Sequence, residues 1–377
     1  MLWRPNPVNA GIFAYYGVCV LSTLDAWRID VEAWDPSVAF FEILKMLEFY
    51  MVFFMVGLAA SNLKEIRRHL TVFFVVAFIV STYAIFSIGR LSRVSAPFEA
   101  GGTEPNTLGG YLTIVICLAA ALMLCAPSRK WKFVFAFVAM LSFVPFVMTL
   151  SRASYLALVV GFIALGMLSR RFSILALVAV VLFVSPWVMP EEVRKRVNYT
   201  FQESGGESVS IAGNETGLQI DTSTYERIYV WQKVKFNLTV WPWFGGGVSW
   251  ETVLDSQYAR VLIETGVVGF TAFLFLLYRV FKTARESFRW SRDWVARGIA
   301  LGVAASTVGL IVHGMGTISF LIVRIMEPFW FLLALSVVAR EVALREHTQR
   351  VLAWKESKAK IAEPIRAASP AADAVLT

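Results

Sequence analysis

An arginine, a glycine-rich turn and an aspartate follow one another between residues 223 and 270, and their types suit work on an anionic ligand. Arg227 lies in YERIYVW, the glycines follow in PWFGGG, and Asp255 directly precedes an apolar run. A guanidinium holds a phosphate through two parallel hydrogen bonds. The stretch therefore offers an arginine and a carboxylate to one face of the protein, and the other segments must position them.

The segment that carries Arg227 has the pattern of a helix docked on an apolar body. Ser223 and Glu226 form a capping box that predicts a helix start. The following residues on one face are spaced by four, three and four: Arg227, Trp231, Val234 and Leu238. We expect this face to dock, with Arg227 pointing inward, and the helix to end at the Pro242 turn.

Composition places the chain among membrane proteins. Of its 377 residues, 57% are hydrophobic and 16% are charged, whereas soluble domains have about 45–50% apolar and about 25% charged residues. The net charge of +8 does not indicate a nucleic-acid partner, because loop charges in a membrane protein report the side of the membrane. The three cysteines lie in apolar runs without a metal or redox pattern. No cleavable signal peptide is expected at the start.

Ten apolar stretches approach the length of about 20 residues that a membrane-spanning helix needs. The first, sixth and seventh are short. The stretches cover residues 9–24, 38–60, 70–89, 107–126, 131–150, 153–168, 172–189, 257–280, 297–317 and 319–338. The expected fold is an all-α polytopic membrane protein with about ten transmembrane helices.

Loop charges predict which side each connection occupies. Basic connections alternate with less basic ones, and lysine and arginine are enriched on the cytoplasmic side. The basic connections contain Lys64, Arg67 and Arg68; Arg129, Lys130 and Lys132; Arg170 and Arg171; and Lys282, Arg285, Arg289 and Arg292. Both termini are therefore expected in the cytoplasm.

This topology defines two segments outside the membrane. Residues 190–256 form one large extracytoplasmic loop in a membrane domain of residues 1–344. Within the loop, EEVRKR after Pro190 starts like a helix, and the polar residues 203–222 predict a mobile loop. Residues 345–377 are expected to be a disordered cytoplasmic tail.

Arginines on the outer side need a reason, because a charge at bilayer depth costs at least about 2.5 kcal/mol without a partner or cavity. Positive charges kept where the topology rule disfavours them favour an anionic ligand. The arginines concerned are Arg90, Arg93, Arg152, Arg227, Arg260 and Arg324.

Structural alternatives exist for several of these residues. Arg90 and Arg93 have the position of interfacial anchors, and Glu327 stands where it could pair with Arg324. Arg260 has the helical spacing to pair with Asp255 or Glu264. His313 is more typical of a hydrogen-bonded core histidine than of a base, and Gly266 and Gly269 are typical of close helix packing.

Six segments in order along the chain resemble landmarks of the bacterial O-antigen ligase and O-antigen polymerase family. They are GGTEPNTLGGYL at 101–112, TLSRASYLALVVG at 149–161, YERIYVW at 225–231, PWFGGG at 242–247, DSQYARVLIETGVVGF at 255–270 and EPFWFLLAL at 327–335. The resemblance implies a C-type glycosyltransferase membrane fold. It also implies an inverting transferase without metal or cofactor, whose donor is an undecaprenyl-diphosphate-linked oligosaccharide.

Residue roles follow from the same resemblance. Arg152 and Arg227 match arginines that hold the donor diphosphate, a role also assigned here to Arg90, Arg93 and Arg324. Asp255 replaces the histidine of the ligase motif His-x10-Gly, and Gly266 is its glycine. As a carboxylate, Asp255 could act as the base for an acceptor hydroxyl. This replacement favours a polymerase over a lipid A core ligase. The resemblance implies one or two further membrane helices before residue 9, so the first ten residues are expected to be either a true short start or a truncated one.

Other classes of function remain open at this stage. A flippase or transporter of lipid-linked sugars would also need arginines for a diphosphate, although transporters usually contain repeated halves, and none is visible here. A structural membrane subunit would not need the arginines. The expected location is the bacterial inner membrane. The expected partners are membrane lipids, a glycan or lipid acceptor, a chain-length regulator and a flippase.

Overall fold

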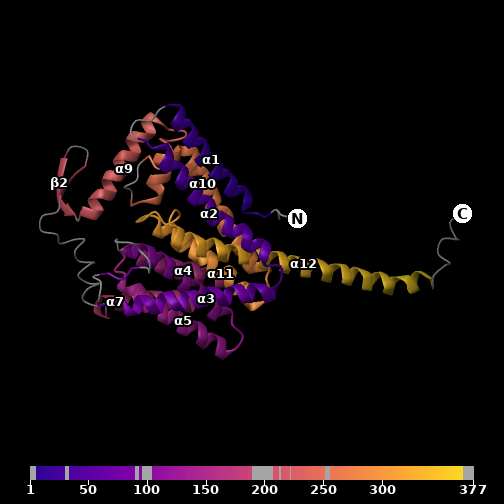
Figure 1. Cartoon of the computed structure of the whole chain (residues 1–377). Coiled ribbons are helices and arrows are strands. Elements are labelled where there is room, and N and C mark those ends of the chain that lie inside the picture. Colours follow the sequence, from indigo (N-terminus) through magenta and orange to yellow (C-terminus); the bar gives the residue numbers. More distant parts are fainter. Residues whose placement is uncertain are drawn as a thin grey trace.

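The computed structural model describes residues 6–29, 34–89, 93–95, 104–188, 207–211, 214–220, 222–250 and 255–367 (Figure 1). Apart from one hairpin, the elements of this part are helices. The first seven are α1 (Asn9–Arg28), α2 (Pro36–Ala59), α3 (Leu63–Phe86), α4 (Pro105–Cys125), α5 (Arg129–Met148), α6 (Arg152–Ser169) and α7 (Phe172–Val188). The others are β1 (Glu207–Ile211), β2 (Asn214–Ile220), α9 (Thr222–Val240), α10 (Gln257–Trp290), α11 (Trp294–His313) and α12 (Val323–Ala367).

The apolar stretches of the sequence all form helices. Each of the ten lies largely within one helix among α1–α7 and α10–α12. Within the described residues, seven helices are long and apolar enough to cross a membrane, namely α1, α3, α4, α5, α6, α10 and α11. Helices α2 and α12 are not among these seven, and α7 is a shorter apolar helix. The fold is that of a membrane-embedded helical protein, and ten spans remain a prediction.

Helices α4 and α11 form the centre of the bundle. Both pack against α6, and α11 also packs against α4 and α10. Burial covers 83% of the apolar window of α4 and 78% of that of α11, but only 22% of that of α5. Large apolar side chains on the outer helices, such as Phe133 and Phe172, are exposed. Apolar exposure of this extent suits contact with lipid tails.

Polar caps set where several helices begin. The Asp35 carboxylate accepts a hydrogen bond from the Ser37 N–H, and Pro36 occupies the first turn of α2. At α3, Asn62 accepts from the Glu65 N–H while the Glu65 carboxylate accepts from the Ser61 N–H. Such reciprocal bonds satisfy main-chain donors that the first helical turn leaves unpaired.

The segment predicted as a large polar loop contains regular structure. β1 and β2 pair as an antiparallel hairpin within residues 207–220, where the sequence predicts a mobile loop; the prediction of an all-α fold is wrong at this hairpin. Main-chain pairing satisfies the donors and acceptors of a polar sequence without a core of its own. The helix predicted after Pro190 lies outside the described residues.

The C-terminal segment also departs from expectation. α12 continues through Ala367, so residues 345–367 are helical where disorder is expected. The residues Arg345, Glu341, Arg350 and Glu346 form i,i+4 ion pairs along this helix, which favours the extension. In Figure 1, α12 projects from the bundle at the end away from α9 and the hairpin.

Candidate functional site

Helix α10 is broken at Gly266, eleven residues after Asp255. Gly266 has φ of 60° and ψ of −163°, a conformation that glycine adopts without steric cost. A Cβ atom at this position would lie 2.4 Å from the Trp243 carbonyl oxygen. Gly266, which the sequence predicts to serve close helix packing, therefore interrupts α10 where the Trp243 main chain approaches it.

The turn at residues 242–247 fills the break. In an unbroken helix, the N–H groups of Val267 and Val268 would donate to the carbonyls of Ile263 and Glu264. Here Val267 and Val268 donate to the carbonyls of Pro242 and Trp243, at 2.9 and 3.2 Å.

The freed carbonyls are satisfied by the same turn. The Gly246 N–H donates to the Ile263 oxygen at 2.9 Å, and the Gly247 N–H donates to the Glu264 oxygen at 3.0 Å. All four main-chain groups that the break releases therefore have partners, as an apolar environment requires.

Backbone geometry explains why this turn contains three consecutive glycines. Gly245 and Gly247 have φ of 71° and 95°, which disfavours side chains with a Cβ. A Cβ on Gly246 would lie 2.5 Å from the Trp250 ring. The PWFGGG motif is thus a structural requirement of the repaired break.

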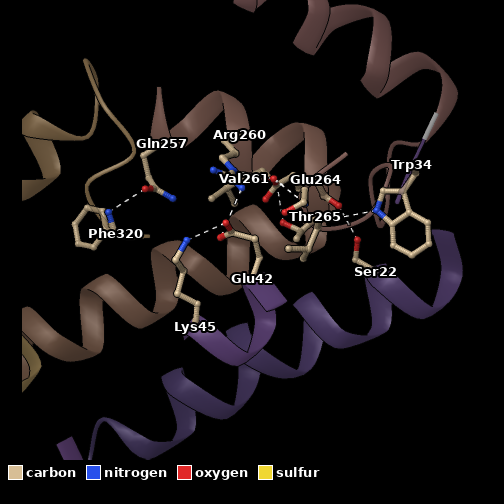
Figure 2. Close-up of polar contacts among 12 residues, drawn as sticks. Ser22, Trp34, Glu42, Lys45, Gln257, Arg260, Val261, Glu264, Thr265 and Phe320 are labelled. Atoms are coloured by element: carbon tan, nitrogen blue, oxygen red, sulfur yellow. Dashed lines mark hydrogen bonds and ion pairs between the residues drawn. The ribbon is translucent and has the colours of Figure 1, made fainter. Parts of the chain in front are cut away.

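Two side chains from the start of the chain hold the turn against α10. The Ser22 hydroxyl of α1 lies 2.6 Å from both the Phe244 and the Glu264 carbonyl oxygens. The Trp34 indole N–H donates to the Val248 carbonyl at 2.8 Å (Figure 2). The break is therefore tied to α1 and to the segment before α2.

A charge cluster lies beside the break. Arg260 Nε donates to Glu264 Oε1 at 2.7 Å, and the Ser249 N–H donates to the same oxygen at 2.9 Å. Both partners of the ion pair are buried, at 5% and 4% exposure. Arg260 also lies 3.9 Å from Glu42, which pairs with Lys45 at 3.1 Å (Figure 2). These four side chains balance in charge.

The sequence-based expectation that Arg260 pairs on its own helix is confirmed, and Glu264 is the partner. The cluster pairs the Arg260 charge internally, so this arginine is not the anion holder. Glu264 in turn fixes the main chain at Ser249, directly after the glycine turn. The cluster positions the first part of α10 and Asp255 before it.

A second polar group surrounds His313, which ends α11 and is fully buried. His313 Nε2 lies 3.0 Å from Ser154 Oγ and Nδ1 lies 2.7 Å from Ser319 Oγ. Ser154 Oγ donates to Ser151 Oγ at 2.8 Å, and Ser151 Oγ donates to Asn106 Oδ1 at 2.7 Å. The expectation of a hydrogen-bonded core histidine is confirmed.

Donor counting fixes the direction of this chain of hydrogen bonds. Because the Ser154 hydroxyl donates to Ser151, it can only accept from His313. His313 then carries its proton on Nε2, and Nδ1 accepts from the Ser319 hydroxyl. The chain runs from the buried turn before α12 to the partly buried Asn106 of α4.

These contacts gather the N-termini of four helices at one end of the bundle. Ser151 and Asn106 join the starts of α6 and α4, and Ser319 precedes α12. At the start of α10, the Gln257 N–H donates to the Gly314 carbonyl at 2.9 Å, and Gln257 Oε1 accepts from the Phe320 N–H at 2.9 Å. Each helix N-terminus carries a partial positive charge, and the C-terminal end of α11 at His313 offsets part of it.

Three of the predicted site residues lie at this end. Arg152 is the first residue of α6 and is partly buried, Arg324 is the second residue of α12 and is exposed, and Asp255 precedes α10 and is exposed. The ion pairs of the described residues do not include one between Arg324 and Glu327. The predicted site residues Arg152, Asp255 and Arg324 thus share one end of the fold.

Arg93 stands next to this group with a structural role. Its Nε donates to the Thr149 carbonyl at 3.1 Å and its Nη2 to the Leu150 carbonyl at 3.3 Å. Leu150 has φ of 51°, so these bonds support a strained turn just before Arg152. Arg90 lies outside the described residues.

The docking of α9 is confirmed in outline and corrected in detail. Val230 and Val234 are buried against Ala259 and Ile263 of α10. Trp231, expected on the docked face, is 49% exposed, because the buried stripe advances by four residues from Val230 to Val234. Arg227 lies in α9, and the direction of its side chain lies outside the described part of the structure.

Sequence reasoning missed the serines and amides that connect the helix starts. Gln257 is fully buried, and its Nε2 has no hydrogen-bond partner among the described residues. The signal was an amide residue opening an apolar helix, where burial makes a polar side chain costly. In the described part of the chain, no three His, Cys, Asp or Glu residues are placed to hold a metal ion.

Two comparisons with known proteins identify no family for this chain. A scan against protein-family models finds no match, and a search of the curated proteins finds none either. The class that fold and site define is a membrane-embedded helical protein with a broken helix and a group of helix starts at one end.

Proposed function

We propose that this protein is a membrane glycosyltransferase of the O-antigen ligase and polymerase type. It would transfer or polymerise undecaprenyl-diphosphate-linked glycan at the outer face of the bacterial inner membrane, with both termini in the cytoplasm. Polymerisation is favoured over ligation to lipid A core because Asp255 replaces the ligase histidine. The observation that carries the proposal is the meeting of four helix N-termini beside Arg152 and Arg324.

The proposed donor suits this electrostatic environment. Its diphosphate is the leaving group and gains charge as the bond to the sugar breaks, and fixed positive groups stabilise such charge most in a preorganised site. Charge-assisted hydrogen bonds contribute about 1.5–3 kcal/mol each. Arg152, Arg227 and Arg324 with the helix N-termini would supply these interactions.

The proposed reaction balances with residues of this chain. The acceptor hydroxyl oxygen bonds to the anomeric carbon of the donor sugar from the side opposite the diphosphate. The bond from that carbon to the diphosphate oxygen breaks, and the electron pair leaves with the diphosphate. The hydroxyl proton passes to the Asp255 carboxylate, which is exposed and therefore accessible to an acceptor.

A transporter of lipid-linked sugars is the second candidate, and one observation favours it. Broken helices near the middle of the membrane form substrate sites in many transporters, and α10 breaks at Gly266. In this protein, however, the turn occupies all four main-chain groups at the break. Arg152 and Arg324 lie instead at helix starts.

Purified protein given a lipid-linked repeat unit tests the proposal. We expect Arg152→Ala, Arg227→Ala and Asp255→Ala each to abolish formation of longer glycan, while each variant still inserts into the membrane. Lys235→Ala is the matched control, because Lys235 is an exposed cation on α9. Full activity of all three variants would refute the assignment.

Two further arms separate the alternatives. A second lipid-linked repeat as the acceptor tests polymerisation, and lipid A core tests ligation. Proteoliposomes that contain the lipid-linked sugar on one side only test transport. Movement of the lipid without any new glycosidic bond would favour the transporter. A flippase and a chain-length regulator are the partners that a polymerase would need.

A further inference from the structure

A cavity of about 300 Å³ lies at the opposite ends of the helices from the candidate site. It is formed where α4 and α6 end, where α10 ends, and where α11 begins. Its charged lining consists of Arg171, Arg292 and Arg297. Three cations around one small cavity repel each other unless an anion lies between them.

The arginines are not neutralised by carboxylates of the described chain. Arg171 Nη2 donates to the Leu124 carbonyl at 3.1 Å, and the Arg297 guanidinium lies over the Phe288 ring at 5.0 Å. No ion pair among the described residues includes any of the three. The helix C-termini around the cavity, such as that of α4 at Leu124, offset part of this positive charge, and the remainder is available to an anionic ligand.

The nearest carboxylate in sequence has other partners. Asp293 follows Arg292, and its Oδ1 accepts from the N–H groups of Val295 and Ala296 at the start of α11. Its Oδ2 pairs with Arg67 at 2.6 Å. Asp293 thus caps the helix and binds another arginine instead of the cavity arginines.

The remaining lining indicates what kind of anion fits. Leu124, Phe288 and Leu301 contribute apolar surface, and Trp294 contacts Trp131 with ring centroids 5.9 Å apart. Tryptophan is enriched where lipid headgroups meet the hydrocarbon. The lining is mainly polar with some apolar side chains, which suits a phosphate headgroup at the membrane surface.

We propose that this cavity binds the phosphate of an anionic membrane phospholipid. Basic pockets between membrane helices on the cytoplasmic side are suited to such headgroups. Arg171 and Arg292 belong to the basic connections of the chain, and Arg297 lies near the start of α11. Planar guanidinium groups bind phosphate oxygens through paired hydrogen bonds. The site is independent of the glycan site, because none of its residues lies at the helix starts around His313.

Lipid binding by the purified full chain tests this site. Wild-type protein in detergent is titrated with phosphatidylglycerol and, separately, with phosphatidylcholine, and bound lipid is counted by native mass spectrometry. The test variant is Arg171→Gln/Arg292→Gln/Arg297→Gln. The matched control is Arg289→Gln, an exposed arginine of α10 that does not line the cavity.

We expect the triple variant to bind phosphatidylglycerol at least about tenfold more weakly than wild type and the Arg289→Gln control. Phosphatidylcholine should bind weakly to all three. Equal phosphatidylglycerol binding by wild type and triple variant would overturn the proposal, as would an equal loss in the control. Because the lining arginines are largely exposed, their substitution should not disturb the fold. Elution of each variant as a single species in size-exclusion chromatography checks this.

A parallel arm uses inorganic phosphate instead of lipid. Arginine-dependent binding of phosphatidylglycerol but not of free phosphate at millimolar concentration assigns the site to a lipid headgroup. Arginine-dependent binding of free phosphate alone supports a phosphate site whose ligand comes from solution. Arginine-independent binding of both would contradict the site in either form.

Discussion

At the scale of single residues, the glycines have the most specific roles. Gly245, Gly247 and Gly266 adopt positive φ where two main-chain segments meet, so their lack of a side chain is a geometric need and not a general sign of flexibility. Gly57, in contrast, has open space where a Cβ would be. The same residue type therefore differs in importance by position.

Replacing Gly266 with alanine is expected to destabilise the protein. The Gly266 backbone lies in a region that essentially only glycine adopts and that costs other residues about 1–3 kcal/mol, and the new Cβ would overlap the Trp243 carbonyl oxygen. Gly57→Ala in α2 should be neutral or stabilising by up to about 1 kcal/mol. Thermal unfolding in detergent measures both. A Gly266→Ala midpoint equal to that of Gly57→Ala would contradict the role of the break.

The buried Arg260–Glu264 pair makes a second prediction at this scale. Arg260→Met leaves the Glu264 carboxylate buried without its counter-charge, and losing one partner of a buried pair costs about 3–5 kcal/mol. In Arg260→Met/Glu264→Gln both charges are gone, while the Gln oxygen can still accept from the Ser249 N–H. We expect the double variant to be more stable than Arg260→Met in thermal unfolding. A double variant less stable than the single would show that the Glu264 carboxylate stabilises the fold without Arg260, which contradicts this prediction.

At the scale of elements, the break in α10 and the docking of α9 act as one unit. The first part of α10 presents Ala259 and Ile263 to α9, and its carbonyls at 263 and 264 receive the glycine turn that follows α9. The position of α9, and with it the Arg227 backbone, thus depends on the geometry at Gly266.

A charged substitution on the docked face should release α9. Val234 is 4% exposed, whereas Phe236 is 66% exposed, so Val234→Asp buries a carboxylate without a partner and Phe236→Asp does not. Hydrogen exchange across residues 229–240 should be faster in Val234→Asp than in wild type and unchanged in Phe236→Asp. Equal protection in all three proteins would mean that α9 is not held by this face.

At the scale of the whole molecule, the two proposed anion sites lie at opposite ends of the bundle. The candidate glycan site lies among helix starts at one end, and the arginine-lined cavity lies with the basic connections at the other. If the basic end faces the cytoplasm, the glycan site faces the opposite side. This arrangement would let a lipid-linked donor and an anionic lipid bind without competing.

Cysteine labelling in whole cells checks this orientation. In a variant lacking Cys19, Cys117 and Cys125, a membrane-impermeant maleimide should label Lys235→Cys in intact cells. Lys130→Cys should be labelled only after lysis. Both positions are exposed, so access depends on the side of the membrane. Labelling of Lys130→Cys in intact cells would reverse the proposed topology.

Local sequence features predicted the helices well because their cause is local. A run of apolar residues forms a helix in a membrane whatever its neighbours are, since the helix satisfies its own main chain. The docking of Val234 and the pairing of Arg260 with Glu264 also followed from spacing along one helix. The hairpin and the helical residues 345–367 were missed because their polar composition does not distinguish disorder from pairing or helical ion pairs.

The sequence by itself determined a helical membrane protein with arginines, an aspartate and a glycine motif in a set order. Only the tertiary structure decided that the PWFGGG turn fills the gap in α10 and that the Ser22 hydroxyl bonds to the Glu264 carbonyl 242 positions away. It also decided that His313 and its serines join the starts of α4 and α6 to the turn before α12. Only packing brought Arg171, Arg292 and Arg297 around one cavity. Spacing describes neighbours on one helix, whereas contacts between distant segments depend on how the helices pack.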